Sequence, residues 1–203
     1  MRVTILPLAF FLSVVIFLGS CNTAYAMEEI GQSRIHPAHP LYFLKTICES
    51  LELKFAGTPR TVLIRKLEFA TRRLREVNSL AKAGNFELII PTMEKYSSRI
   101  ASLPDQGIED QELVLIIENN LSNHLEVLQM MNSQIEDSRA KMSIRAAINK
   151  IIQRADLTPS TRLKGCEFLS KEASSSALNE VEKEILLQRA QKCRELMPET
   201  YSN

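Results

Sequence analysis

The stretch from Thr58 to Gly84 limits the fold of this chain more than any other, because it carries a complete set of helix signals. Thr58 can cap the first turn, Pro59 fits the first helical position, and Gly84 can end the helix in the left-handed conformation. Apolar residues recur between them at spacings of three and four, at Leu63, Leu67, Ala70, Leu74, Val77 and Ala81. Such a helix has to bury its apolar stripe against other helices.

The rest of the chain supplies helices with the same periodicity. We expect them over about 40–56, 85–103, 109–155, 158–173 and 177–197. Pro91 either bends the second of these or marks its start near Ile90. In the long pattern 109–155 the heptad phase slips around Ser138–Lys141, which predicts a bend or a change of packing partner. Strand-like alternation is absent, so we expect an all-α antiparallel helical bundle of about five to six helices.

The first of these helices has its own stripe, which we expect to be buried against the helix that follows. Its members are Leu41, Leu44, Cys48, Leu51 and Phe55. Only a short turn at Gly57–Thr58 separates the two helices, so they should be antiparallel neighbours.

Residues 1–26 are typical of a secretory signal. Arg2 precedes an apolar run from Ile5 to Leu18, and Ala24-Tyr25-Ala26 resembles a signal-peptidase site. The run Leu18-Gly19-Ser20-Cys21 offers a second interpretation, a lipoprotein in which Cys21 carries the lipid. An uncleaved anchor is the third, although the run is shorter than the ~20 residues that span a bilayer. Each interpretation predicts an extracytoplasmic protein.

The boundaries follow from these patterns. We expect a signal peptide at 1–26, a linker at 27–39, a helical bundle at 40–156 and a C-terminal helical hairpin at 157–203. Past residue 26 the chain has 24 basic and 24 acidic residues. A balanced charge gives no general attraction to nucleic acid or to anionic lipid.

Two short runs resemble motifs of a known family. Tyr42-Phe43-Leu44-Lys45 followed by Glu49 is similar to a YxLK…E helix, and Arg73-Leu74-Arg75-Glu76 is similar to an RLxE motif. Both are typical of the domain of unknown function 5667 (DUF5667), whose later helix resembles Asn123–Leu128. The resemblance covers roughly residues 37–135. It implies an extracytoplasmic helical domain, and it transfers no catalytic or ligand-binding residue.

The cysteines and histidines are the candidates for chemistry. Cys48, Cys166 and Cys193 lie on apolar stripes, where a cysteine packs as a small hydrophobe. A Cys166–Cys193 disulfide is the alternative, but a hairpin turning near Ser175 would leave Cys193 ~13 Å too far along its helix. His124 occupies a core position, which favours a hydrogen-bonded interface residue over a general base. His36 and His39 sit between prolines, which favours a linker over a metal site.

Two basic clusters, 60–75 and 139–154, are interpreted as solvated helix faces. The second also contains an apolar face that could exceed what one core needs, and we expect it to bind a partner helix: Ile144, Ile148, Ile151 and Ile152.

No phosphate-binding loop, nucleophile elbow or Cys-x-x-Cys pair is present in the sequence. We therefore expect no catalytic residue, cofactor or metal. The predicted function is a non-enzymatic module that binds an envelope protein or itself, and that meets the membrane only through a signal anchor or a lipidated Cys21. The alternative is an envelope enzyme or metal-binding protein that uses His124 or the pair His36 and His39.

Overall fold

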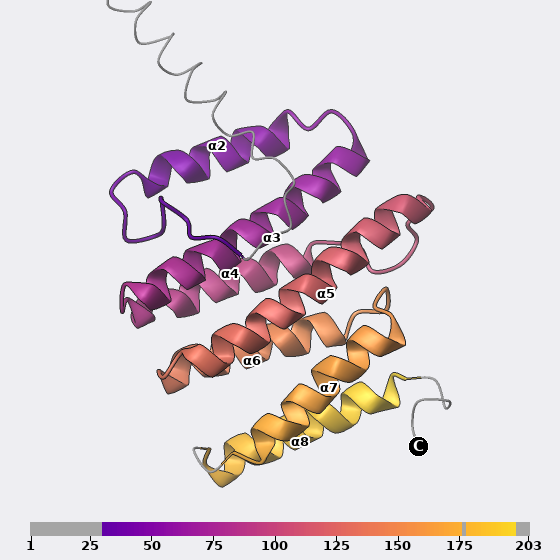
Figure 1. Ribbon diagram of the computed structural model, residues 1–203. Coiled ribbons are helices and arrows are strands. Elements are labelled where there is room, and N and C mark those ends of the chain that lie inside the picture. Colours follow the sequence, from indigo (N-terminus) through magenta and orange to yellow (C-terminus); the bar gives the residue numbers. More distant parts are fainter. Residues whose placement is uncertain (1–29, 176–177, 198–203) are drawn as a thin grey trace, which may run out of the picture.

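The computed structural model describes residues 30–175 and 178–197. Within these ranges the chain is all-α, with no strand, as predicted (Figure 1). The elements are α2 (Tyr42–Lys54), α3 (Pro59–Lys82), the 3-10 helix η1 (Phe86–Leu88), α4 (Ile89–Ala101), α5 (Gln111–Gln134), α6 (Ser138–Ile152), α7 (Pro159–Ala173) and α8 (Glu180–Glu195).

Local signals place most helix ends correctly. The hydroxyl oxygens of Thr58 and Thr158 accept hydrogen bonds from the N3 amides of α3 and α7, and each threonine is followed by proline at the first helical position. Gly84 has φ +71°, the left-handed conformation expected after α3. Helix α4 begins at Ile89, so Pro91 lies in its first turn and the helix does not bend around it.

The predicted long helix 109–155 is wrong, because the chain breaks it into α5 and α6. Ile135 is extended, with ψ 133°, and the carboxylate of Asp137 accepts a hydrogen bond from Ala140 N at 2.7 Å. Asp137 is therefore the N-cap of a new helix. The slip in the heptad phase marks this corner.

The helices pack in successive antiparallel pairs, from α2 and α3 at one end to α7 and α8 at the other (Figure 1). One core of apolar side chains runs through all the pairs from α3 onward. The predicted partner-binding face lies inside this core, since Ile144, Ile148, Ile151 and Ile152 are each 0 % exposed. That prediction is wrong for a packing reason: α6 lies between α4, α5 and α7, which cover its apolar face.

Helix α7 approaches α6 closely at Gly165. A Cβ atom at this position would lie 2.3 Å from Cγ2 of Ile152, a branched side chain with little freedom to move aside. The absence of a side chain at Gly165 thus sets the spacing between the two helices.

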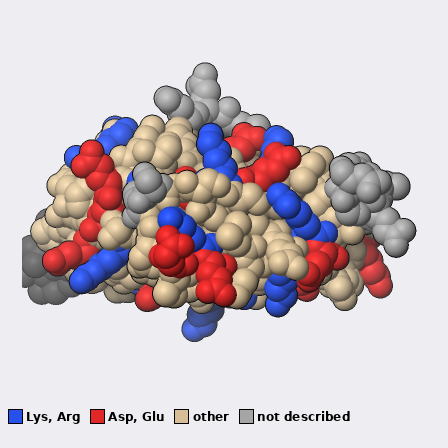
Figure 2. Space-filling model, turned by 90° about the horizontal axis from the view of Figure 1, so that it is seen from below, with Lys and Arg blue, Asp and Glu red and all other residues tan. Residues whose placement is uncertain are grey.

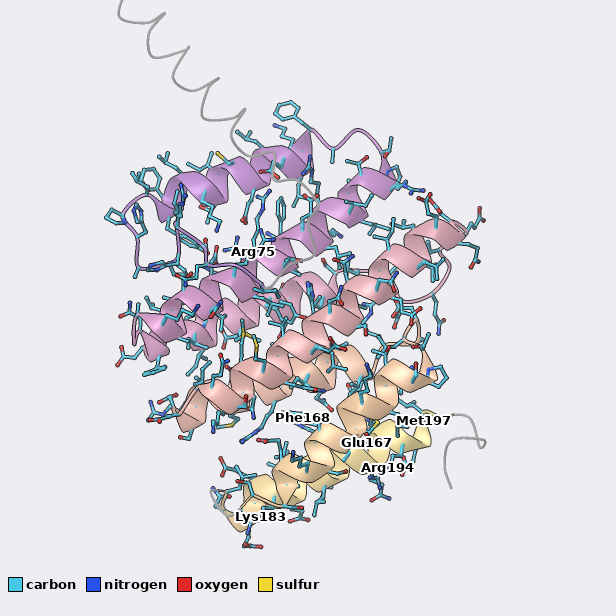
Figure 3. All side chains as sticks on the ribbon, in the orientation of Figure 1. Arg75, Glu167, Phe168, Lys183, Arg194 and Met197 are labelled. Atoms are coloured by element: carbon cyan, nitrogen blue, oxygen red, sulfur yellow. A yellow bond between two sulfur atoms is a disulfide. The ribbon has the colours of Figure 1, made fainter. Side chains whose placement is uncertain are left out.

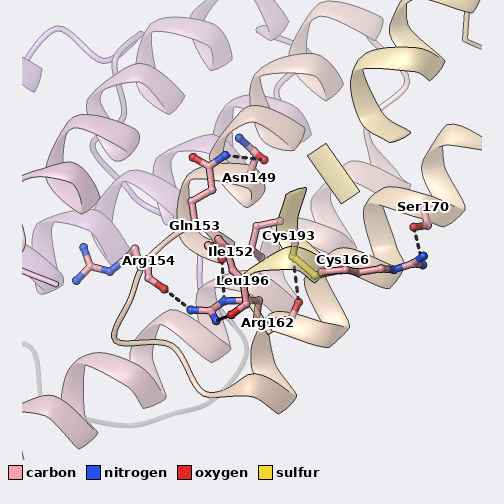
Figure 4. The surroundings of a disulfide bond; sticks show 10 residues. Asn149, Ile152, Gln153, Arg154, Arg162, Cys166, Ser170, Cys193 and Leu196 are labelled. Atoms are coloured by element: carbon pink, nitrogen blue, oxygen red, sulfur yellow. Dashed lines mark hydrogen bonds between the residues drawn. A yellow bond between two sulfur atoms is a disulfide. The ribbon is translucent and has the colours of Figure 1, made fainter. Parts of the chain in front are cut away.

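Cys166 and Cys193 form a disulfide between α7 and α8, with Cα atoms 5.8 Å apart (Figure 4). The sequence interpretation of core packing without a bond is therefore wrong. Cys166 lies seven residues before the end of α7, whereas Cys193 lies thirteen residues after the start of α8. At ~1.5 Å per residue, α8 begins about 9 Å beyond the end of α7, and this shift brings the two cysteines level.

Among the described residues, no helix is both long enough and apolar enough to cross a membrane. The predicted signal segment and Cys21 lie outside the described residues.

Candidate functional site

Helix α2 turns its polar side toward α3, the reverse of the predicted orientation. Its one buried residue is Glu49. The α2–α3 charge network, as we name it, consists of Tyr42, Lys45 and Glu49 from α2 with Arg73 and Glu76 from α3. The helical spacing of the first three puts them on one face of α2, and Arg73 and Glu76 are one turn apart on α3.

Arg73 is the centre of this network. Its guanidinium, 3 % exposed, pairs with the Glu49 carboxylate and donates to Glu76 Oε2 at 2.8 Å and to the Tyr42 hydroxyl. The Tyr42 hydroxyl in turn donates to Glu76 Oε2 at 3.2 Å. Two carboxylates thus share one guanidinium in a buried site, an arrangement that is stable only while every member has its partner.

Lys45 joins a third segment to the network. Its ammonium lies 2.6 Å from Glu76 Oε1 and donates to Ser33 Oγ at 3.1 Å and to the Ile35 carbonyl at 3.0 Å. Residues 30–41, the N-terminal strap, are also fixed to α3, because Ser33 and Ser79 exchange hydrogen bonds. The predicted linker is therefore held against the bundle over its described part.

Burial dominates the electrostatics of the network. It raises the pKa of the Glu49 carboxyl, and the positive charge of Arg73 opposes this shift. Burial, together with the neighbouring Glu76 carboxylate, also raises the pKa of the Tyr42 hydroxyl, which therefore stays protonated at neutral pH.

The opposite side of α2 is apolar and exposed. The α2 ridge consists of Phe43, Ile47, Leu51 and Phe55, each four residues after the last, with exposures of 57, 51, 38 and 77 %. The predicted burial of Leu51 and Phe55, and of Leu41 at 42 % exposure, is wrong. The reason is that the carboxylates of α2 form ion pairs with arginines of α3, so the charged side of α2 packs against α3.

Few polar groups interrupt the ridge. The hydroxyls of Thr46 and Ser50 donate back to helix carbonyls at 2.7 and 3.0 Å, which leaves them little to offer a partner. Both acidic residues of α2 face α3, where Glu52 binds Arg72 through two hydrogen bonds of 3.1 and 3.0 Å. Lys54 is the one charged residue of α2 whose side of the helix is exposed to solvent.

His124 lies in the interior, as predicted, between two hydroxyl groups. Its Nε2 is 2.8 Å from Thr71 Oγ1 and its Nδ1 is 3.3 Å from the Tyr96 hydroxyl. The Thr71 hydroxyl donates to the Leu67 carbonyl, so its oxygen is left to accept from Nε2–H, and Nδ1 accepts from Tyr96. Burial lowers the pKa of His124 to about 4, and the neutral ring acts as a link between helices.

The remaining candidates do not form a site. His39 Nδ1 accepts a hydrogen bond from Leu41 N, and the carbonyl of His36 accepts one from His39 N. Within the described part of the chain, no group of three or more His, Cys, Asp or Glu residues is placed to hold a metal ion.

Three arginines predicted to lie on solvated faces are instead buried: Arg73, Arg145 and Arg154. Arg145 binds Glu172 at 2.6 Å, and Arg154 binds Asp156 together with three carbonyls in the last turn of α4 and just after it. Arg162 is also buried and donates to the carbonyls of Ile152, Arg154 and Leu196 (Figure 4). Sequence periodicity could not identify these arginines, because each has at least one partner in a distant segment of the chain.

The network and the ridge lie within a region that matches a known family. The model of DUF5667, a domain of unknown function, matches residues 34–138, just over half of the chain. The chain belongs to the DUF5667 family. The two DUF5667 motifs noted in the sequence, Tyr42–Lys45 with Glu49 and Arg73–Glu76, supply all five members of the network. No curated protein and no solved structure matches the chain.

Proposed function

We propose that this DUF5667 protein is an exported, non-enzymatic module that attaches to a component of the cell envelope through the α2 ridge. The observation that supports the proposal is the reversed orientation of α2. A helix that turns its carboxylates inward and four large apolar side chains outward leaves a surface whose exposure to water is unfavourable. Contact with another surface would remove that cost.

The charge network supports the same role, because it holds the helix from behind. Binding through the ridge needs no rearrangement of α2, whose inward face is fixed to α3 and to the strap by Arg73 and Lys45. A surface that is rigid before binding loses little conformational entropy on contact.

The disulfide supports export. Bonds between cysteines form and persist in oxidising compartments outside the cytoplasm, and Cys166 and Cys193 are paired in the interior of the protein. This agrees with the secretory signal that the sequence predicts at residues 1–26.

Cell fractionation tests the proposal, with Cys21→Ala as the background so that a lipid cannot hold the protein. We expect Phe43→Gln with Ile47→Gln to release the protein from the envelope fraction. The matched control is Val181→Gln with Leu187→Gln, two residues of α8 with comparable exposures of 66 and 53 %, which should leave it there. A folded α2 variant that still co-fractionates with the envelope would show that the ridge is not the attachment surface.

A further inference from the structure

The size of the α2 ridge restricts the kind of envelope component that fits it. Stable protein–protein interfaces involve about 20–30 residues on each side. The ridge has four apolar side chains in one row along a single helix at the edge of the molecule (Figure 1). One helix face is enough, however, for a helix that lies in the surface of a bilayer.

Other exposed apolar residues do not form a comparable row. On α8 three charged residues, 182–184, lie between Val181 and Ile185 in the sequence, and Lys183 binds Glu180 at 2.8 Å. Seen from the side of α7 and α8, acidic and basic side chains are interspersed over the surface (Figure 2). The residues labelled on this hairpin in Figure 3 include Glu167, Lys183 and Arg194.

The charge of α2 favours a lipid surface. Glu49 and Glu52 face the arginines of α3, so neither carboxylate points outward with the ridge. Lys54 is exposed and can bind the phosphate group of a lipid. An apolar row with a lysine and no outward acid is suited to anionic lipid headgroups.

The path of the chain places α2 near a membrane attachment. The Ile30 carbonyl accepts a hydrogen bond of 3.1 Å from the side chain of Asn78. Asn78 is two residues after Glu76, which binds Tyr42, so the strap starts near the Tyr42 end of α2. Cys21 lies nine positions before Ile30, a length of chain that spans at most about 30 Å. A lipid on Cys21 would therefore keep α2 close to the bilayer, and weak anchors gain stability from a second contact.

Accepting the proposed function, we infer that the envelope component bound by the α2 ridge is the phospholipid bilayer itself. Helix α2 lies along the membrane surface with Phe43, Ile47, Leu51 and Phe55 among the lipid chains and Lys54 at the headgroups. The bundle from α3 to α8 then lies on the side of α2 that faces away from the membrane.

The chain contains no tryptophan, so a single introduced one reports position without interference. We would compare Phe55→Trp with the control Leu187→Trp in the exported protein, on vesicles of phosphatidylcholine with and without phosphatidylglycerol. With brominated lipid chains, we expect the fluorescence of the Phe55→Trp protein to shift to the blue and to be quenched at least twofold more than that of the control. Phe43→Gln with Ile47→Gln should lower the vesicle partition coefficient about tenfold or more, since two apolar side chains leave the lipid.

Equal quenching of the two tryptophans, or no binding to either vesicle, would overturn the inference. Sedimentation without lipid separates this failure from that of the proposed function. If the protein self-associates and the Phe43→Gln, Ile47→Gln variant is monomeric, the ridge is a contact surface for a second copy and the bilayer is the wrong partner. If the variant also keeps its place in the envelope fraction, the proposed function fails with the inference.

Discussion

Replacing Arg73 by methionine tests whether α2 is held by charge. The change keeps the volume but removes the guanidinium that binds both Glu49 and Glu76, whose side chains are 5 and 0 % exposed. Breaking a buried pair by removing one partner costs about 3–5 kcal/mol, because the other charge stays buried without compensation. For a chain of this size that loss lowers Tm by roughly 6–20 °C.

Arg72→Met is the matched control, since it removes the neighbouring arginine. The Arg72 and Glu52 side chains are 16 and 18 % exposed and Arg72 lies 3.9 Å from Glu49, so solvent reaches these pairs more than the Arg73 pairs and the expected loss is smaller, about 1–2 kcal/mol. Urea unfolding followed by circular dichroism measures both. A cost for Arg73→Met no greater than that for Arg72→Met would refute the reasoning.

The pH dependence of the Arg73→Met variant gives a second check. Burial already raises the pKa of Glu49, and the loss of Arg73 removes the charge that opposes this shift. The folded variant then binds this proton more readily than the wild type does, so the stability deficit of the variant relative to the wild type should narrow as the pH falls. Adding Glu49→Gln should recover at least about 1 kcal/mol, a coupling that a double-mutant cycle measures.

Three further changes have expected outcomes. Gly165→Ala should cost about 1–3 kcal/mol of stability in thermal melts through the α6–α7 clash, whereas Gly57→Ala, with nothing within 4 Å, should be neutral. His124 has a pKa of about 4 in the fold against 6.5 unfolded, so between pH 6.5 and 4 the unfolded chain binds the extra proton and stability is lost as the pH falls. This loss is up to about 3 kcal/mol, and His124→Gln should abolish it in a pH series of urea titrations. Reduction of Cys166–Cys193, or replacement of both by alanine, should lower the free energy of unfolding by about 3–4 kcal/mol.

The sequence could predict the features that depend on neighbouring residues. The caps Thr58 and Thr158, the prolines after them and the left-handed Gly84 are local signals, and the structure has each of them in place. The interior position of His124 was also predictable, because it follows from the apolar periodicity of a single helix. The slip of heptad phase in the sequence corresponds to the break before Ser138, where Asp137 caps the new helix.

The candidate site depended on contacts between distant residues, which periodicity does not contain. Helix α2 has an apolar face and a charged face, and its own sequence does not say which one packs. The choice is made by Arg73 and Glu76, more than twenty residues later, whose pairing with Glu49 and Lys45 stabilises the charged orientation. The disulfide register depends likewise on how far α8 is shifted along α7.

Arg162 joins α7 to the ends of α6 and α8 through contacts that do not depend on pH. Its three acceptors are backbone carbonyls, which do not titrate, and the disulfide at Cys166 lies one turn further along α7. These contacts therefore stay intact as the pH falls. At pH 4 the amide protons around Arg162 should still be protected from exchange with deuterium.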